Sequence, residues 1–412
     1  MDKISWLWYD KKNEMKDKEY MKRFFKSLII SLCAGIPLAV LLIVFLYTNQ
    51  KEDTFERIEL DFSEETTVSE EEHIKQESIQ QPEQAVETDV QSEEIIEPEQ
   101  TKSSVTLAFA GDVHFSELVS QNYDNAGISA VVDNSMLTHM QNADFFMLNH
   151  EFVFSLRGEA MEDKEYTLRN DPKYVKILQE LGTDAVTLAN NHVLDFGQTA
   201  FLDTLQTLNE AKIEYTGGGY DLDDASEPIV QTIGGQTFAI FAATRVSPSY
   251  DWYASSKRPG VFQTYDASAL NKAIQDAEAL YDHTIVYVHW GIERNEVPEE
   301  YQRTLAKGYI DAGTDLIIGA HPHVLQGFEY YNGVPIIYSL GNYLFGNRTG
   351  ETLLLNAIFD ESGKLDIQLI PCERVNGVLK KIANPEQLFS HLTDLSFGVT
   401  VSEDGILRSN NE

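Results

Sequence analysis

Short apolar runs of the kind that form buried strands recur along the chain after residue 104, and each ends in a polar segment. These runs occupy residues 105–110, 144–148, 184–188, 284–288 and 316–318. Helical patterns, in which apolar residues return every three or four positions, lie between them at residues 172–181 and 199–211. This repetition predicts an α/β domain, in which ligands bind at the carboxyl ends of the strands.

A different apolar pattern occupies residues 27–47, which carry no charge and are long enough to cross a hydrocarbon core of roughly 30 Å as a helix. Lysines and arginines precede this run and acidic residues follow it, so residues 1–26 are expected to form a cytoplasmic tail. A cleaved signal peptide is the alternative, but residues 48–51 lack the small residues of a cleavage site. We expect an uncleaved, single-pass anchor that leaves the rest of the chain outside the cell.

Residues 48–103 are rich in Glu, Gln, Ser and Thr and nearly lack aromatic residues. Such a segment cannot bury enough apolar surface to offset its ordering entropy. We therefore expect a disordered acidic linker that holds the next domain away from the membrane. A patch that recruits cations or a cationic partner is the alternative interpretation of the same charges.

The remaining residues predict one α/β domain at 104–350, completed by C-terminal strands and a tail at 351–412. Residues 351–360 and 364–373 alternate polar and apolar positions around a Glu-Ser-Gly turn, which predicts a hairpin. The chain has 412 residues, of which 42% are hydrophobic, and this excludes a fully disordered protein. Its net charge of −35 argues against nucleic acid as a partner, and two cysteines cannot build a disulfide framework or a Cys-rich zinc site.

Candidate chemistry gathers where the predicted strands end. The carboxyl ends of parallel strands meet at one edge of a sheet, so the polar residues there are expected to share a rim. Oxygen and imidazole ligands without thiolate suit Mn, Fe or Zn ions in a catalytic site. The candidates at this rim are Asp112, His114, Glu151, Asn191, His192, His289, His321 and His323.

Two pairs of these residues are spaced by one intervening position. Asp112 and His114 form one pair, and His321 and His323 flank Pro322 in the other. Alternate residues of an extended segment point the same way, so each pair could meet one metal ion or two neighbouring ions. Pro322 is expected to hold His321 in an extended conformation, which would preorganise both imidazoles.

The motifs GDVHF, NHE, LANNHVLDFG, VHWGIE, IIGAHPHVLQGFEYYNG and IYSLGNYLFG, in this order, resemble the CapA (PgsA) family of poly-γ-glutamate capsule synthesis proteins. That family belongs to the calcineurin-like metallophosphoesterase superfamily. The resemblance implies a metallophosphoesterase-like α/β/β/α sandwich and two divalent metal ions. It implies one ion on Asp112, His114 and His323, a bridging Glu151, and a second ion on Asn191, His289 and His321.

The resemblance also implies that His192 approaches the reacting group as a general acid or charge stabiliser. Asp195 either orients the His192 loop or caps a turn. Arg169, Glu293 and Asn342 are candidate substrate-binding residues, although Glu293 could equally form an ion pair and Asn342 could fix a loop. The sequence departs from the superfamily where Glu151 replaces a bridging Asp and where its motifs are NHE and ANNH, so the substrate need not sit as in phosphatases.

Two functions remain open. In the first, the chain is an extracellular metal-dependent hydrolase or transferase that acts on polyglutamate, a related amide or an envelope phosphoester. In the second, it is a non-catalytic anchored component that supports a polymer synthase or guides its product outward. The acidic outer domain should repel an anionic polymer at long range, so metal charge, Arg169, or Lys257 and Arg258 would have to attract it locally.

Overall fold

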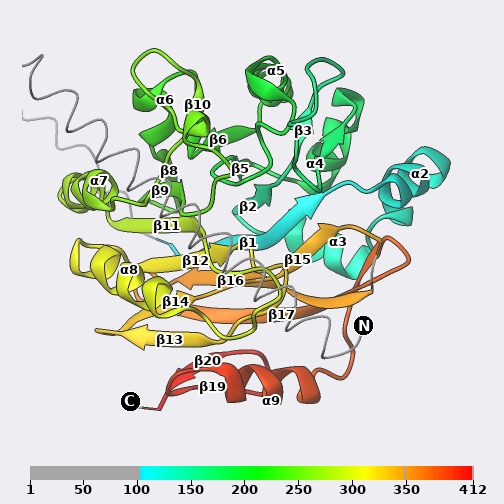
Figure 1. Ribbon diagram of the computed structural model, residues 1–412. Helices are drawn as coiled ribbons and strands as arrows, with labels where there is room; N and C mark the ends of the chain where they lie inside the picture. The colour runs from blue at the N-terminus through cyan, green and yellow to red at the C-terminus, as the bar shows by residue number, and fades with distance from the viewer. Residues whose placement is uncertain (1–102, 348, 411–412) are drawn as a thin grey trace, which may run out of the picture. The chain divides into compact units, whose positions relative to one another are not determined.

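The computed structural model describes residues 103–347 and 349–410 (Figure 1). The predicted tail, membrane anchor and linker up to residue 102 lie outside these residues. Within the described part of the chain, no helix is both long and apolar enough to span a bilayer. The described residues form a mixed α/β fold, built on two β-sheets.

The first sheet has the strand order β18-β17-β16-β1-β2-β5-β6, with β15 also paired to β1. Strands β1, β2, β5 and β6 run parallel, whereas β16, β17 and β18 add an antiparallel half. The predicted C-terminal hairpin is confirmed, since β16 and β17 pair along their length. The bounds are β1 (Val105–His114), β2 (Phe145–His150), β5 (Ala185–Thr187), β6 (Glu214–Thr216), β15 (Asn342–Phe345), β16 (Gly350–Phe359), β17 (Leu365–Val375) and β18 (Val378–Lys381).

The second sheet has the order β13-β14-β12-β11-β9-β8, with parallel pairing from β9 through β11 and β12 to β14. Three short pairs lie outside the two sheets. The strands of the second sheet are β8 (Ile229–Ile233), β9 (Gln236–Thr244), β11 (His283–His289), β12 (Leu316–Ala320), β13 (Phe328–Tyr331) and β14 (Val334–Ile337). The short pairs are β3 (Val153–Phe154) with β4 (Arg169–Asn170), β7 (Gly218–Gly219) with β10 (Gly260–Val261), and β19 (Val399–Val401) with β20 (Leu407–Ser409).

Alternation of side chains across the strands produces three apolar cores and therefore four layers. Inward-facing residues of both sheets, such as Phe109 and Tyr287, form the middle core together with α9 (Glu386–Leu395). The outer face of the first sheet packs against α2 (Glu117–Ala126), α3 (Asn134–Gln141), α4 (Val175–Leu181) and α5 (Gly197–Ala211). The outer face of the second sheet packs against α6 (Leu222–Ser226), α7 (Ser268–Glu278) and α8 (Glu300–Asp311), as Figure 1 shows. Strands covered on both faces need continuous apolar sequence, which explains the runs in the chain.

Several strands extend further than their apolar runs predicted. Strand β1 continues to His114 and β2 continues to His150, so Asp112 and Asn149 lie within strands rather than in the loops that follow. The extension of β1 follows from a change of neighbour. Residues up to Ala110 pair with β16, and from Asp112 onward β1 pairs with β15. Because β15 is far from β1 in the sequence, the hydrophobic pattern around residues 105–114 does not predict this pairing.

Gly111 lies where β1 changes its neighbour. A Cβ atom at this position would lie 1.9 Å from the carbonyl oxygen of Gly341, and that carbonyl accepts the 2.9 Å hydrogen bond from the Asp112 amide. No larger residue fits unless the two backbones separate. Gly111 thereby sets how closely the strand that carries Asp112 approaches β15.

We predict that Gly111→Ala lowers the free energy of unfolding by about 2–3 kcal/mol, because backbone atoms must move to admit the methyl group. The control is Gly308→Ala in α8, where a Cβ atom would meet nothing within 4 Å. Replacement of a helical glycine with alanine should raise stability by roughly 0.5–1 kcal/mol. Denaturant unfolding of both variants provides the measurement. Equal stability of the two variants would contradict the tight packing at Gly111.

Candidate metal centre

Strand ends from both sheets deliver acidic, amide and imidazole side chains to one buried place. The first sheet contributes residues from β1, from the end of β2 and from the segment after β5, and the second sheet contributes the end of β11 and the segment after β12. Each of these side chains is buried or nearly so. The residues brought together are Asp112, Glu151, Asn191, His192, His289, His321 and His323.

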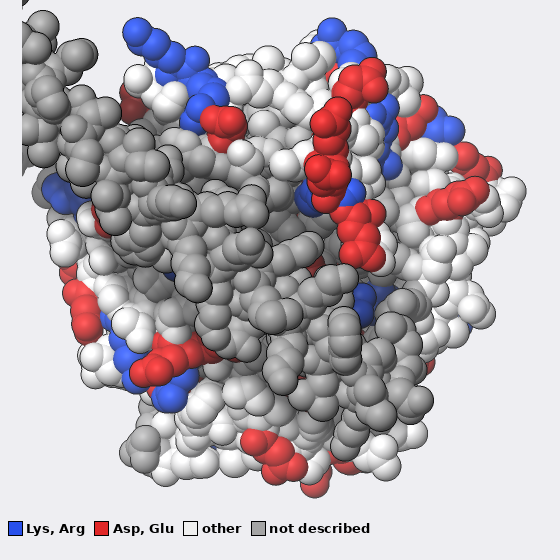
Figure 2. Space-filling model, viewed as in Figure 1, with Lys and Arg blue, Asp and Glu red and all other residues white. Residues whose placement is uncertain are grey.

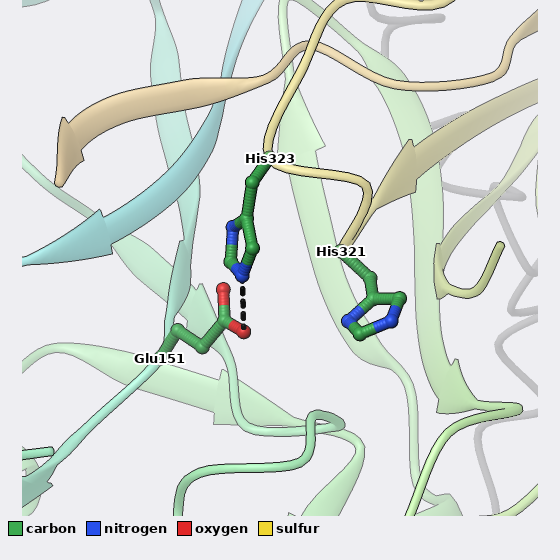
Figure 3. Close-up of side chains that lie close together, drawn as sticks. All are labelled: Glu151, His321 and His323. Carbon is green, nitrogen blue, oxygen red and sulfur yellow. Dashed lines mark ion pairs between the residues drawn. The ribbon is translucent and has the colours of Figure 1, made fainter. Parts of the chain in front are cut away.

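Two clusters of possible metal ligands share Glu151. One consists of Glu151, His321 and His323, and the other consists of Asp112, Glu151 and His289. In each cluster the ligand atoms lie within 4.8 Å of one another. Glu151 Oε1 is 3.6 Å from His289 Nε2 and 3.9 Å from His323 Nε2, and Figure 3 shows His323 directed at Glu151 with His321 beside it. The shared carboxylate suits a bridging ligand.

Two buried ligand atoms in this region have no hydrogen-bond partner among the described residues, and they are Glu151 Oε1 and His321 Nδ1. Burial raises the pKa of the Glu151 carboxyl well above its ordinary value, and the negative charge of Asp112 raises it further. Such a carboxylate is costly to ionise without a cation beside it. The donor set of carboxylate oxygens and imidazole nitrogens therefore fits divalent metal ions.

The protonation of the imidazoles also suits metal binding. Burial lowers the pKa of His321 to about 3, and it holds the pKa of His289 well below its ordinary value. Positive charge on either ring would also be opposed by its histidine neighbours. Both rings are therefore neutral near pH 7, which is the form that binds a metal ion.

Asp112 and His323 are held together by neighbouring polar groups. His323 Nδ1 lies 3.1 Å from Asp112 Oδ2 and 2.9 Å from Asn342 Oδ1. Burial by itself would raise the pKa of Asp112, but hydrogen bonds from His323 and Asn149 keep it below its ordinary value. Asp112 is therefore a carboxylate, and Asn342 helps to fix the orientation of the His323 ring.

Asn149 organises the centre and was not among the residues expected from sequence. Its Nδ2 donates to Asp112 Oδ1 at 2.8 Å and to Glu151 Oε2 at 3.2 Å, and it lies 3.3 Å from His289 Nδ1. Asn190 Nδ2 in turn donates to Asn149 Oδ1 at 3.0 Å. Asn149 stands two residues before Glu151, and this strand spacing was a signal that could have identified it.

The expected extended conformation of the His321-Pro322-His323 segment is wrong. His321 has φ +95° and His323 has φ +59°, so both occupy the left-handed region that side chains with a Cβ atom rarely adopt. The backbone turns at each histidine rather than presenting alternate residues on one face. The strain is concentrated at the two residues that flank the candidate centre.

His114 belongs to neither ligand cluster. The register of β1 against β15 shifts between Asp112 and Val113, where β15 carries one extra residue. The His114 ring packs edge-on against Phe345, with 5.5 Å between ring centroids, and lies 5.8 Å from the ring of Phe152. It borders the centre as an aromatic-packed side chain.

His192 is oriented by Asp195, whose Oδ2 lies 2.7 Å from His192 Nδ1. Asp195 also accepts a hydrogen bond from Lys164 and another, at 2.7 Å, from the backbone amide of Leu168. Burial lowers the pKa of His192, whereas Asp195 favours its charged form. Lys164 lies between β3 and β4 with no local pattern around it, and sequence reasoning had no means of finding it.

A cleft of about 650 Å³ opens beside the centre. His192, His323, Glu293 and Asn342 are among the residues that line it. Two of the three expected substrate-binding residues, Glu293 and Asn342, therefore face the same space as the candidate ligand His323. Arg169 does not line this cleft, since its guanidinium stacks 3.5 Å from the ring centroid of Phe196 and donates to the carbonyl of Gly158.

Comparison with known proteins identifies the sequences that this chain resembles. A model of the family described as "Bacterial capsule synthesis protein PGA_cap" matches residues 106–347. The PGA biosynthesis protein CapA of Bacillus subtilis (strain 168) is 31% identical over 274 residues, which cover 65% of this chain and 71% of that protein. The capsule biosynthesis protein CapA of Bacillus anthracis is 28% identical over 309 residues, covering 72% and 74%.

Similarity to solved structures is weaker. The NAD nucleotidase NadN of Haemophilus influenzae aligns with a TM-score of 0.42 and 14% identity, over 72% of this chain and 57% of that one. This level of structural similarity does not bear on the chemistry of the site. The relationship to the capsule synthesis family rests on the sequence matches.

The buried His150 next to Glu151 gives a prediction about acid stability. Its ring centroid lies 3.8 Å from that of Phe152 and 4.9 Å from that of Phe154, and burial lowers its pKa from 6.5 to about 3. The unfolded chain takes up a proton below pH 6.5 that folded His150 does not, so stability is lost as pH falls from 6.5 toward 3.

We predict that His150→Met removes this contribution. Between pH 7 and pH 5, the free energy of unfolding should fall by about 2 kcal/mol less in this variant than in the unsubstituted protein. Denaturant titrations across this pH range provide the measurement, and any constant packing cost cancels in the comparison. Phe154→Met disturbs the same aromatic cluster without removing a titratable group, and its pH dependence should match that of the unsubstituted protein. If the free energy of unfolding of His150→Met fell with pH as steeply as that of the unsubstituted protein, His150 would not be held neutral in the fold.

Proposed function

Because the chain belongs to the family of bacterial capsule synthesis proteins, we propose that it is a metal-dependent hydrolase or transferase that acts on poly-γ-glutamate or a related envelope polymer. Relatives with capsule and PGA biosynthesis in their names support this substrate class. The proposal includes a metallophosphoesterase-like centre with two divalent ions. The observation that carries it is the sharing of buried Glu151 between two ligand clusters.

The proposed roles follow from the geometry. Asp112, Glu151, His289, His321 and His323 would hold the ions. Divalent ions at such a centre supply Lewis acidity for activating water and for stabilising the charge that develops on the group under attack.

His192 would exchange a proton with the reacting group at Nε2, because its Nδ1 faces Asp195. Asp195 stabilises the charged form of the ring and fixes its orientation. Lys164 opposes that charge and holds the Asp195 carboxylate in place. Asn342 would orient His323, and Glu293 would border the polymer's backbone amides in the cleft rather than its carboxylates.

Attachment to the membrane is part of the proposal. The apolar run at residues 27–47 would anchor the chain in the cell membrane, with the N-terminus in the cytoplasm and the α/β domain outside. This topology would place the cleft where an exported polymer emerges, beside polymer synthase subunits. The flanking charges in the sequence support this part of the proposal.

The alternative is a non-catalytic component that supports a synthase, and the name "Probable polyglutamine synthesis accessory protein", carried by a Mycobacterium tuberculosis relative, favours it. The two functions differ in whether His192 is needed. If His192→Ala and Asp112→Ala both sustained polymer production at the level of the unsubstituted protein, the catalytic proposal would be abandoned for the accessory one.

We predict that Glu151→Gln abolishes metal binding, because it removes the charge of the shared ligand. Elemental analysis of the purified full-length chain measures the metal content. The control is Glu361→Gln in the exposed turn between β16 and β17, which should retain the metal.

Addition of chelator should also reverse which of the two proteins, Glu151→Gln or the unsubstituted protein, has the higher melting temperature. With metal present, the unsubstituted protein melts at the higher temperature because bound ions stabilise the folded state. With chelator, Glu151→Gln melts at an equal or higher temperature, because the fold no longer buries an uncompensated carboxylate. Metal content equal to that of the unsubstituted protein would show that Glu151 is not a ligand.

We predict that His192→Ala lowers kcat on γ-glutamyl oligomers by about 10²- to 10⁴-fold while metal content is unchanged. Asp195→Asn should lower it by about 10²-fold, since it weakens the orientation of the ring and the stabilisation of its charge. Asp366→Asn, at an exposed position on β17, is the matched control and should keep full activity. Hydrolysis at the unsubstituted rate in His192→Ala would remove His192 from the mechanism.

A further inference from the structure

Arg374 is a buried cation in the cleft beside the candidate metal centre. It lies near the end of β17, it is only 7% exposed, and it lines the same cleft as His192 and His323. It also lies outside residues 106–347, which the family model matches.

The guanidinium of Arg374 has unused hydrogen-bonding capacity. Its Nη1 donates to the carbonyl oxygen of Phe345, whereas its buried Nε has no partner among the described residues. No carboxylate in the described part of the chain lies close enough to form an ion pair with it, and the charge of Asp112 favours its charged form only at longer range. By contrast, the less buried Arg303 is paired with Glu329 through two hydrogen bonds.

A buried charge without a directly bonded counter-ion is costly, and an anion bound beside it would reduce that cost. Burial lowers the pKa of Arg374 to about 10, which still leaves the side chain charged at neutral pH. An anion is the ligand that this arrangement lacks. A guanidinium offers two parallel N–H groups to a carboxylate, and this geometry favours a planar carboxylate.

The position of Arg374 relates it to the reacting centre. Phe345, whose carbonyl holds the guanidinium, packs its ring 4.7 Å from that of His323, measured between ring centroids. Gly350 lies opposite Arg374 in the β16–β17 ladder. A Cβ atom at Gly350 would lie 2.6 Å from Arg374 Nη2, so the glycine leaves room for the guanidinium.

We propose that Arg374 binds a free carboxylate of the substrate inside this cleft and thereby selects a γ-linked glutamyl chain, which carries one carboxylate beside each backbone amide. This inference rests on the proposed function for the identity of the polymer, but it requires only binding and not turnover. Glu293 and Glu351 line other parts of the cleft. Their negative charges would repel the other carboxylates of the polymer from those parts. The carboxylate would therefore be favoured beside Arg374 and away from these acidic groups.

The test is isothermal titration of the metal-loaded, full-length chain with two probes. One probe is a γ-linked glutamate oligomer, and the other is the same oligomer with its free carboxyls converted to amides. We expect the unsubstituted protein to bind the carboxylate oligomer about tenfold or more tightly than the amide oligomer. Arg374→Gln should lose this preference by weakening only the binding of the carboxylate oligomer.

Two further variants separate charge from geometry. Arg374→Lys keeps the charge but not the paired donors, and Gly350→Ala keeps the arginine but displaces its tip, so both should retain part of the preference. Arg408→Gln, at an exposed position of β20, removes one positive charge away from the cleft, and this variant should bind the oligomers like the unsubstituted protein. Thermal melting of Arg374→Gln should occur at an equal or higher temperature, because an unpaired buried charge has been removed.

A preference for carboxylate that survives in Arg374→Gln would overturn the inference, as would an unsubstituted protein that binds both oligomers equally or binds neither. Inorganic phosphate that binds through Arg374 while the carboxylate oligomer does not would also overturn it. These results are distinguishable from failure of the proposed function, which is measured as absent metal or absent hydrolysis. Loss of hydrolysis alone leaves the binding preference measurable.

Discussion

Burial of the Glu151 carboxylate beside a second carboxylate is the constraint on which the rest of the site depends. Two negative groups removed from water repel one another strongly, and the raised pKa of Glu151 reflects that cost. Glu151 Oε1 faces His289 and His323 at distances longer than a hydrogen bond, although Asn149 donates to the other oxygen. The side chains therefore surround a charge that they do not neutralise, and a cation is the natural complement. The neutral rings of His289 and His321 are suited to bind such an ion.

Rigid packing is what allows this costly arrangement to persist. Three apolar cores fix the two sheets and their helices, and the strand ends that converge on the site are parts of those sheets. Close contact at Gly111 sets the position of Asp112, and the backbone is left-handed at His321 and His323, which form a ligand cluster with Glu151. Strain of this kind survives where the surrounding structure over-determines the conformation. The packing free energy of the surrounding fold therefore offsets the strain and the buried charge at the site.

Much of this fold could be predicted because buried strands and amphipathic helices leave periodic patterns in sequence. The polar residues at strand ends followed from the same reasoning, and Asp112, Glu151 and His289 do lie together. What could not be predicted depends on contacts between distant segments. His114 lies outside the ligand clusters and packs against Phe152 and Phe345, and contacts with such distant residues are not visible near residue 114. Lys164 reaches Asp195 from a loop, and Arg374 reaches the cleft from a strand beyond the recognised motifs.

The distribution of charge constrains how such a site can take an anionic polymer. The chain carries a net charge of −35, and Figure 2 shows acidic side chains at the upper right, the left and the bottom of the view, with basic side chains near several of them. Fields from exposed charges are screened over roughly 8–10 Å at physiological salt, so repulsion fades within about that distance of the surface. Attraction must then come from contacts inside the cleft, where screening is weak. Buried Arg374 lies there, and the candidate metal centre borders the cleft through His323. Recognition is therefore set by the few groups that enter the cleft and not by the length of polymer outside it.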